Sequence, residues 1–267
     1  MLRKINGAWI NVLENGNPQA LPVVFVHGFP FSHAMWHRQL QVVSSEFRAI
    51  AYDVRGMGES SVGDGQYTIE EHVDDLIALL DDMGIAGAVV VGLSMGGYIA
   101  LRALERNLPR FRAAILCDTR SEADSNEERL GRALAVAEVK RRGAPAFADD
   151  FVKKIFANGS LARIPDEISL IHGIISRTTP IAIAGTLLAL AARTDTTASL
   201  GKLNIPTLIL VGDQDITTPP EASRSMHQKI PGSTLRIIPD AAHMSPLENP
   251  EAVNGAMMAF LRALKTP

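Results

Sequence analysis

The chain has 267 residues, of which 46% are hydrophobic and 21% are charged, and its formal net charge is −3 at pH 7. These proportions are ordinary for a globular protein, and the lack of a basic excess argues against nucleic acid as a partner. The single cysteine, Cys117, excludes a disulfide within the chain. Because it lies in an apolar run, we expect a buried thiol rather than a reactive one.

The N-terminal segment carries charge and no apolar segment follows it, so we expect no signal peptide. The longest apolar run, residues 181–192, is shorter than the roughly 18 residues that a membrane span requires. We therefore expect a cytoplasmic protein that binds neither nucleic acid nor a membrane. The sequence predicts no particular oligomeric state.

The chain opens with a hairpin signal, because Asn6-Gly7 between two β-forming segments is typical of a type I′ turn. Strands and helices then alternate. The predicted strands are residues 21–26, 47–53, 88–91 and 112–117, and the predicted helices are residues 32–45, 69–83 and 97–107. Thr68 is the expected N-cap of the second helix, and Gly84 is expected to end it. Such alternation predicts a mostly parallel sheet with helices on both faces.

The alternation stops after residue 120. Residues 121–202 show helical patterns without a β-rich run, and strands resume at 206–212 and 234–239, before an amphipathic helix at 251–265. We therefore expect a core domain made of residues 1–120 and 203–267, with residues 121–202 inserted as a helical cap. The cap is expected over the carboxyl edge of the sheet, where open α/β sheets bind ligands.

Ser94 occupies the centre of a G-x-S-x-G sequence, between Gly92 and Gly96. An apolar strand precedes this pentapeptide and a helical segment follows it, which is the context of a nucleophile elbow. Small neighbours let the backbone fold tightly, so that the serine hydroxyl stands clear of it. The sequence therefore predicts that Ser94 is a nucleophile.

A serine hydroxyl needs a base to accept its proton and an acid to orient that base. His243 lies on a loop between the last predicted strand and the final helix, and Asp215 follows the preceding strand. Both are therefore expected at the sheet edge where Ser94 lies. Asp213, two residues from Asp215, and Asp118, directly after an earlier strand, are alternatives for the acid.

These motifs resemble those of the α/β-hydrolase fold superfamily over essentially the whole chain. The matching segments are residues 27–30 (His-Gly-Phe-Pro), 53–60 (Asp-Val-Arg-Gly-Met-Gly-Glu-Ser), 92–97 (Gly-Leu-Ser-Met-Gly-Gly), 212–215 (Gly-Asp-Gln-Asp) and 242–243 (Ala-His). Within the superfamily, the chain is most similar to small bacterial carboxylesterases and 3-oxoadipate enol-lactonases. The resemblance implies a mostly parallel eight-stranded sheet flanked by helices, with a helical cap insertion.

The same resemblance implies roles for individual residues. Ser94, Asp215 and His243 are expected to be catalytic, and the backbone N–H groups of Phe29 and Met95 are expected to form the oxyanion hole. This chemistry calls for no metal and no organic cofactor, and the glycine spacing does not match a phosphate-binding loop.

Other residues are expected to be structural. By the family pattern, His27 holds the oxyanion loop by hydrogen bonding, and Asp53 and Arg55 form a scaffold turn. The remaining histidines fall within helical patterns and are expected to be packing or surface residues: His33, His37, His72, His172 and His227.

The expected function is hydrolysis of a small carboxylic ester, with an enol-lactone as the alternative substrate. A lactone that carries a free carboxylate would need a cation, for which Arg120 and Arg177 are candidates. The apolar run at 181–192 instead favours a plain ester, because it could form the ceiling of an acyl pocket. Carbon–carbon bond hydrolases, cofactor-free perhydrolases and non-catalytic receptors share this fold and stay open as alternatives.

Overall fold

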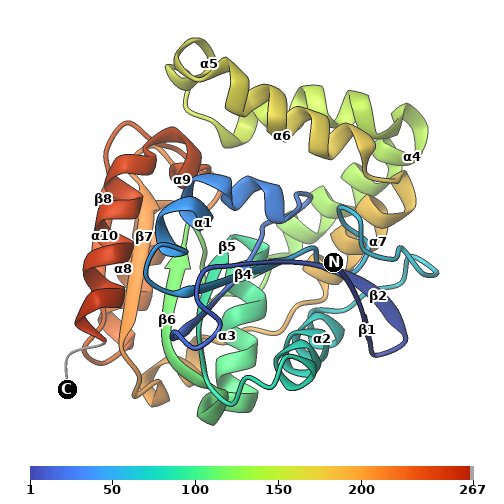
Figure 1. Ribbon diagram of the computed structural model, residues 1–267. Coiled ribbons are helices and arrows are strands. Elements are labelled where there is room, and N and C mark those ends of the chain that lie inside the picture. Colours follow the sequence, from blue (N-terminus) through green and yellow to red (C-terminus); the bar gives the residue numbers. More distant parts are fainter. Residues whose placement is uncertain (265–267) are drawn as a thin grey trace.

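A computed structural model describes residues 1–264, and Figure 1 shows their arrangement. Within these residues, eight strands form one sheet in the order β1-β2-β4-β3-β5-β6-β7-β8. The strands are β1 (Leu2–Ile5), β2 (Ala8–Asn15), β3 (Pro22–Val26), β4 (Arg48–Tyr52), β5 (Ala88–Leu93), β6 (Phe111–Cys117), β7 (Thr207–Gly212) and β8 (Thr234–Ile238). Strand β2 is antiparallel to β1 and β4, and all other pairs are parallel. The predicted eight-stranded, mostly parallel sheet is confirmed.

Helices cover both faces of the sheet, as predicted. The helices are η1 (His33–Trp36), α1 (His37–Val43), α2 (Ile69–Asp82), α3 (Met95–Asn107), η2 (Leu108–Arg110), α4 (Asn126–Ile155), α5 (Ser160–Arg163), α6 (Pro165–Arg177), α7 (Pro180–Ala191), η3 (Thr197–Lys202), α8 (Pro220–Lys229), α9 (Ser245–Glu248) and α10 (Pro250–Ala263). Apolar side chains of α2, α3 and α8 pack on one face, and those of α1 and α10 pack on the other. The core is therefore two apolar layers on either side of the strands.

The local turn and cap signals are confirmed. Asn6 and Gly7 both have positive φ, 44° and 82°, as a type I′ turn requires, and they join β1 to β2. The Thr68 hydroxyl accepts a hydrogen bond from the N–H of Glu71 at 3.0 Å. Gly84, with φ of 65°, follows the end of α2.

The predicted helices differ from the structure at four points. The segment predicted as one helix at 32–45 is a 3-10 turn followed by the short α1, and the helix after the elbow begins at Met95 rather than Gly97. Helix α8 was not predicted, because its sequence is mostly polar and it buries only Ser223 and Met226. The last helix ends at Ala263, and Lys265, its predicted end, lies outside the described residues.

Helices α4 to α7 lie between β6 and β7 in the sequence, where the cap is predicted. In Figure 1, α4, α5 and α6 lie together across one end of the sheet. No single helix within residues 1–264 is long and apolar enough to cross a membrane; α6 and α7 pass that test of length and composition only as a pair bent by 98°. The boundaries 121–202 of a separate cap domain stay a prediction.

His72, on α2, is a buried histidine whose ring nitrogens have no hydrogen-bond partner within the described residues. Burial lowers its pKa from 6.5 to about 3, and the positive charge of Arg55 acts in the same direction. The ring is therefore neutral in the folded protein at pH values where the unfolded chain would bind a proton. His72 lies outside the candidate active site, as predicted, but its low pKa makes the free energy of unfolding depend on pH.

We expect the free energy of unfolding to fall as the pH drops below 6.5, the unfolded pKa of His72. Because the folded pKa is the lower one, this stabilisation is complete above that pH and is lost at about 1.4 kcal/mol per pH unit. Between pH 6.5 and pH 5, the free energy of unfolding measured in urea should fall by about 2 kcal/mol less for His72→Leu than for wild type. His227→Gln, at an exposed histidine, is the control. Equal losses in His72→Leu and wild type would contradict the expectation.

Candidate active site

Ser94 lies on the sharp turn between β5 and α3. Its backbone has φ of 52° and ψ of −113°, a conformation that is strained for any residue with a Cβ atom. The Ser94 N–H donates to the carbonyl of Cys117 at 3.0 Å, and its carbonyl accepts from the Thr119 hydroxyl at 2.9 Å. The neighbouring strand β6 therefore holds the turn, and Ser94 faces a cavity at the carboxyl edge of the sheet.

The two glycines of the elbow are required by close backbone contacts. A Cβ atom on Gly92 would collide with the carbonyl of Gly96, and one on Gly96 would collide with the carbonyl of Val26. These obstacles are backbone atoms of β3 and of the first turn of α3, so they cannot move aside as a flexible side chain can. The G-x-S-x-G spacing thus has a steric cause in this fold.

We expect Gly96→Ala to destabilise the protein by about 3 kcal/mol, because the new methyl group overlaps a fixed carbonyl. The control is Gly255→Ala on α10, where nothing lies within 4 Å of an added Cβ atom. That substitution should stabilise the protein by about 0.5–1 kcal/mol, as alanine favours a helix interior over glycine. Thermal unfolding of both variants measures the difference, and similar melting temperatures would contradict the steric account.

His243 and Asp215 come together above the ends of β7 and β8. His243 Nδ1 lies 2.8 Å from Asp215 Oδ2, and both residues are only 2% exposed. The other carboxylate oxygen accepts the N–H groups of Thr217 and Thr218 at 2.8 and 3.0 Å. The Thr218 hydroxyl also donates to Asp215 Oδ2 at 2.7 Å. The carboxylate is thus fully hydrogen-bonded and fixed against the imidazole.

The ionisation of Asp215 follows from these contacts. Burial opposes ionisation, but the charge and hydrogen bond of His243, with the hydrogen bonds from Thr218, hold the pKa of Asp215 below its usual value. Asp215 is therefore a carboxylate at neutral pH. Because Nδ1 of His243 is engaged by Asp215, Nε2 is the nitrogen that is free for the cavity, which His243 lines together with Ser94.

Within the described residues, neither alternative acid forms a hydrogen bond with His243. Asp118 Oδ1 accepts the N–H of Gly212 at 2.9 Å, and its Oδ2 accepts the Ser245 hydroxyl at 2.6 Å. Burial and the neighbouring charge of Asp215 raise the pKa of Asp118 well above its usual value. Asp213 accepts only a long hydrogen bond, 3.3 Å, from the N–H of Ala241.

The predicted oxyanion loop follows β3, and both Phe29 and Met95 line the cavity of Ser94. His27 holds this loop as expected. Its Nε2 accepts the N–H of Val54 at 2.9 Å, and its Nδ1 lies 2.8 Å from the carbonyl of Gly28. Burial lowers the pKa of His27 to about 4, so the ring is neutral and Nδ1 carries the proton.

The turn that contains Asp53 and Arg55 is structural, as expected. Asp53 accepts hydrogen bonds from His33 at 2.7 Å and from Asn11 at 3.0 Å. Arg55 forms an ion pair with Asp75 at 2.7 Å. Neither Asp53 nor Arg55 lines the cavity of Ser94.

The cavity at Ser94 has a volume of about 350 Å³ and reaches from the elbow to the helices α4 and α7. Its lining is Phe29, Ser94, Met95, Tyr98, Arg120, Glu128, Gly131, Arg132, Ala135, Phe147, Phe151, Lys154, Leu187, Leu190, Thr217 and His243. Of the two predicted cations, only Arg120 is in this lining, because Arg177 lines a separate cavity. Within residues 1–264, no group of three or more His, Cys, Asp or Glu side chains could hold a metal ion.

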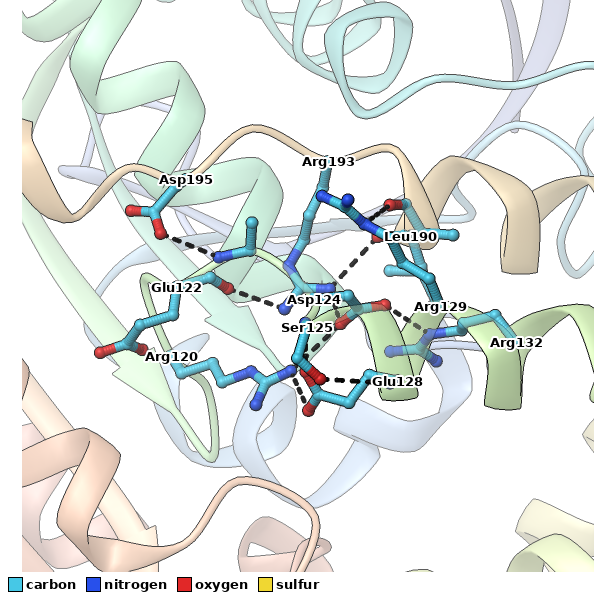
Figure 2. Close-up of polar contacts among 12 residues, drawn as sticks. Arg120, Glu122, Asp124, Ser125, Glu128, Arg129, Arg132, Leu190, Arg193 and Asp195 are labelled. Carbon is cyan, nitrogen blue, oxygen red and sulfur yellow. Dashed lines mark hydrogen bonds and ion pairs between the residues drawn. The ribbon is translucent and has the colours of Figure 1, made fainter.

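Arg120 already forms ion pairs with two acidic residues, Asp124 and Glu128. Figure 2 shows a cluster around the buried Asp124, which pairs with Arg120 at 3.1 Å, with Arg132 at 3.0 Å and with Arg193. Arg120 also contacts Glu128 at 2.6 Å. Asp124 and Glu128 follow Arg120 by four and eight residues, and Arg193 reaches the cluster from the segment after α7.

Two other cations on the cavity wall are less neutralised. Arg132 uses only its Nε for Asp124, so its terminal nitrogens form no hydrogen bond with the described part of the chain. Lys154 has neither a hydrogen bond nor an ion pair within that part. Both residues come from α4 and lie on the wall of the cavity, and sequence patterns did not single them out.

Glu248 is a further residue that sequence reasoning missed. It is 1% exposed, and its Oε2 accepts the N–H groups of Ala242 and Met244, at 2.8 and 3.2 Å, on either side of His243. Its Oε1 accepts the hydroxyl of Ser160, in α5, at 2.7 Å. Glu248 therefore fixes the loop of His243 and ties it to the helical insertion. Only its position, five residues after His243, could have suggested this role.

The sequence model of the alpha/beta hydrolase family matches residues 23–256. The chain belongs to this family. A solved structure of a thermophilic esterase from Thermogutta terrifontis, with malate bound, has a TM-score of 0.94 and 35% sequence identity, covering 100% of this chain and 99% of the other. The hydrolase is also 27% identical over 253 residues to 3-oxoadipate enol-lactonase 2 of Acinetobacter baylyi, covering 95% of this chain and 93% of the relative. A non-heme chloroperoxidase of Kitasatospora aureofaciens is 31% identical over 260 residues, which cover 91% of this chain and 93% of the relative. The predicted resemblance to esterases and enol-lactonases is confirmed.

Proposed function

We propose that this hydrolase cleaves carboxylic esters of small molecules, with Ser94 as nucleophile, His243 as base and Asp215 as the acid that orients the base. One observation carries the proposal: His243 is hydrogen-bonded to the ionised Asp215 and lines the same cavity as Ser94, on its strained elbow. The esterase and enol-lactonase relatives support the same reaction type. The cytoplasmic location expected from the sequence stays a prediction.

The proposed reaction has two halves. Ser94 Oγ attacks the ester carbonyl while His243 Nε2 accepts its proton, and the backbone N–H groups of Phe29 and Met95 stabilise the oxyanion. Each such donor contributes roughly 3 kcal/mol to transition-state stabilisation. His243 then protonates the departing alcohol. In the second half, the same base activates water, which releases the carboxylic acid and restores Ser94.

The cavity lining suits an apolar acyl group. The lining includes four large apolar side chains: Phe147 and Phe151 from α4, and Leu187 and Leu190 from the apolar helix α7. If the cavity holds an acyl group, part of the run at 181–192 lines it, as expected from the sequence. Apolar walls with a few directed polar groups are typical of small-molecule sites.

A second candidate substrate is a lactone with a free carboxylate, as the enol-lactonase relative suggests. The observation in its favour is the pair of cations Arg132 and Lys154 on the cavity wall, with free nitrogens for an anion. Arg120, the cation expected from the sequence, is neutralised by Asp124 and Glu128. A preference for anionic substrates would weaken with added salt.

The test is hydrolysis of p-nitrophenyl esters with an enol-lactone assayed in parallel. A clean Ser94→Ala preparation is the blank. Fast ester turnover that the blank lacks would support a carboxylesterase, whereas fast lactone opening with poor ester turnover would move the assignment to the lactone. Tight binding of either substrate without turnover would contradict both and favour a receptor.

A further inference from the structure

Helix α4 folds back on itself and encloses a second cavity. Gly143, with φ of 81° and ψ of 173°, interrupts the helix, so residues 126–142 and 144–155 form two arms. Arg142 and Asp150 pair between the arms at 2.7 Å. The cavity has a volume of about 250 Å³ and is lined only by residues of α4: Gly131, Leu134, Ala135, Glu138, Val139, Arg142, Phe147, Asp150, Phe151 and Lys154.

This α4 cavity adjoins the cavity of Ser94. Phe147 and Phe151 line both, and their rings stack on each other with centroids 5.2 Å apart. Phe29, on the predicted oxyanion loop, meets both rings edge-on at 6.2 and 5.9 Å. The partition between the two cavities includes this pair of side chains, which rotamer changes can move, whereas a wall of main chain would be fixed.

The lining of the α4 cavity indicates what it can hold. Its apolar lining consists of Leu134, Ala135, Val139 and the two phenylalanines. Its charged lining residues are two of each sign: Arg142 pairs with Asp150 at 2.7 Å and approaches Glu138 at 4.0 Å, while Lys154 forms no ion pair within residues 1–264. A flexible hydrocarbon chain suits such a groove better than a charged or strongly hydrogen-bonding group.

We propose that the α4 cavity is a subsite for the far end of a straight-chain acyl group bound at Ser94. The inference rests on the proposed ester hydrolysis and adds the substrate class, esters of medium-chain and longer fatty acids. The chain passes the edge of Phe147 and Phe151 and ends between the arms of α4. Each methylene that moves from water into the groove should raise kcat/KM about fourfold.

Two exposed leucines on the first arm allow a matched test. Leu134, 61% exposed, lines the α4 cavity, whereas Leu130, 62% exposed and one turn earlier, lines neither cavity. Leu134→Lys places a charge beside the proposed chain, and Leu130→Lys adds the same charge outside it. Neither leucine is buried, so both variants should fold.

The assay is kcat/KM on p-nitrophenyl acetate, butyrate, hexanoate and octanoate, below the concentrations at which the esters aggregate. For wild type, kcat/KM should rise with chain length up to octanoate. Leu134→Lys should lower the value on octanoate by about tenfold, equivalent to roughly two lost methylenes, and leave acetate unchanged. Leu130→Lys should match wild type on both esters.

A second variant tests the partition from the opposite direction. Phe147→Ala joins the two cavities and should raise the octanoate-to-acetate ratio of kcat/KM. Equal ratios in Leu134→Lys, Leu130→Lys and wild type would overturn the subsite, as would a Phe147→Ala ratio that does not rise. If the proposed ester hydrolysis is itself wrong, wild type should not hydrolyse even p-nitrophenyl acetate. The two failures can therefore be told apart.

Discussion

Ser94→Ala is expected to lower kcat for ester hydrolysis by about a million-fold, since it removes the hydroxyl that forms the proposed acyl-enzyme intermediate. Substrate binding should change little, because the ester is held mainly by the cavity wall. The backbone strain at Ser94, with φ of 52°, is the same for serine and alanine. The melting temperature should therefore stay close to that of wild type.

Two measurements distinguish the loss of the nucleophile from misfolding of the variant. A fluorophosphonate should label wild type with a stoichiometry of one, and peptide mapping should place the label on Ser94. The Ser94→Ala variant should remain unlabelled and inactive but folded. Ser45→Ala, at an exposed serine, is the control and should retain both labelling and activity. Full activity in a clean Ser94→Ala preparation would remove Ser94 from the mechanism.

The features that the sequence predicted well depend on residues that are close together along the chain. The elbow at Ser94 follows from a strand, a pair of glycines and a helix in direct succession. The type I′ turn at Asn6-Gly7 and the cap at Thr68 are equally local. The mostly parallel sheet follows from the alternation of such segments, because parallel strands require a crossover between them.

The features that the sequence missed depend on contacts between distant segments. Thr218 and Glu248 support Asp215 and the loop of His243, but neither lies in a pattern that marks a catalytic residue. The fold-back of α4 at Gly143 brings Lys154 and Phe151 to the cavity, and helical periodicity on either side of a break does not give the angle between the arms. Arg177 was a reasonable candidate cation by residue type, yet its helix turns it toward another cavity.

Asp215→Asn is expected to lower kcat by about ten-thousand-fold, whereas Asp118→Asn should lower it less than about tenfold. An asparagine at 215 keeps the shape of the side chain but loses the charge that stabilises the protonated imidazole. Its amide group can also present an N–H to His243 Nδ1 and so favour the wrong tautomer. At position 118, the amide oxygen can still accept the N–H of Gly212, and the amide nitrogen can donate to the Ser245 hydroxyl.

The comparison is informative because both aspartates are buried at the same edge of the sheet, and only their environments differ. His243 and Thr218 hold Asp215 ionised, whereas burial and the charge of Asp215 raise the pKa of Asp118 well above its usual value. A carboxyl group whose pKa is raised holds its negative charge less strongly, so it is less suited to stabilise an imidazolium than Asp215 is. Steady-state kcat of the two variants, with circular dichroism to confirm folding, measures the difference. A larger loss in Asp118→Asn would reverse the assignment, because the acid that orients His243 would then act from β6 rather than from β7.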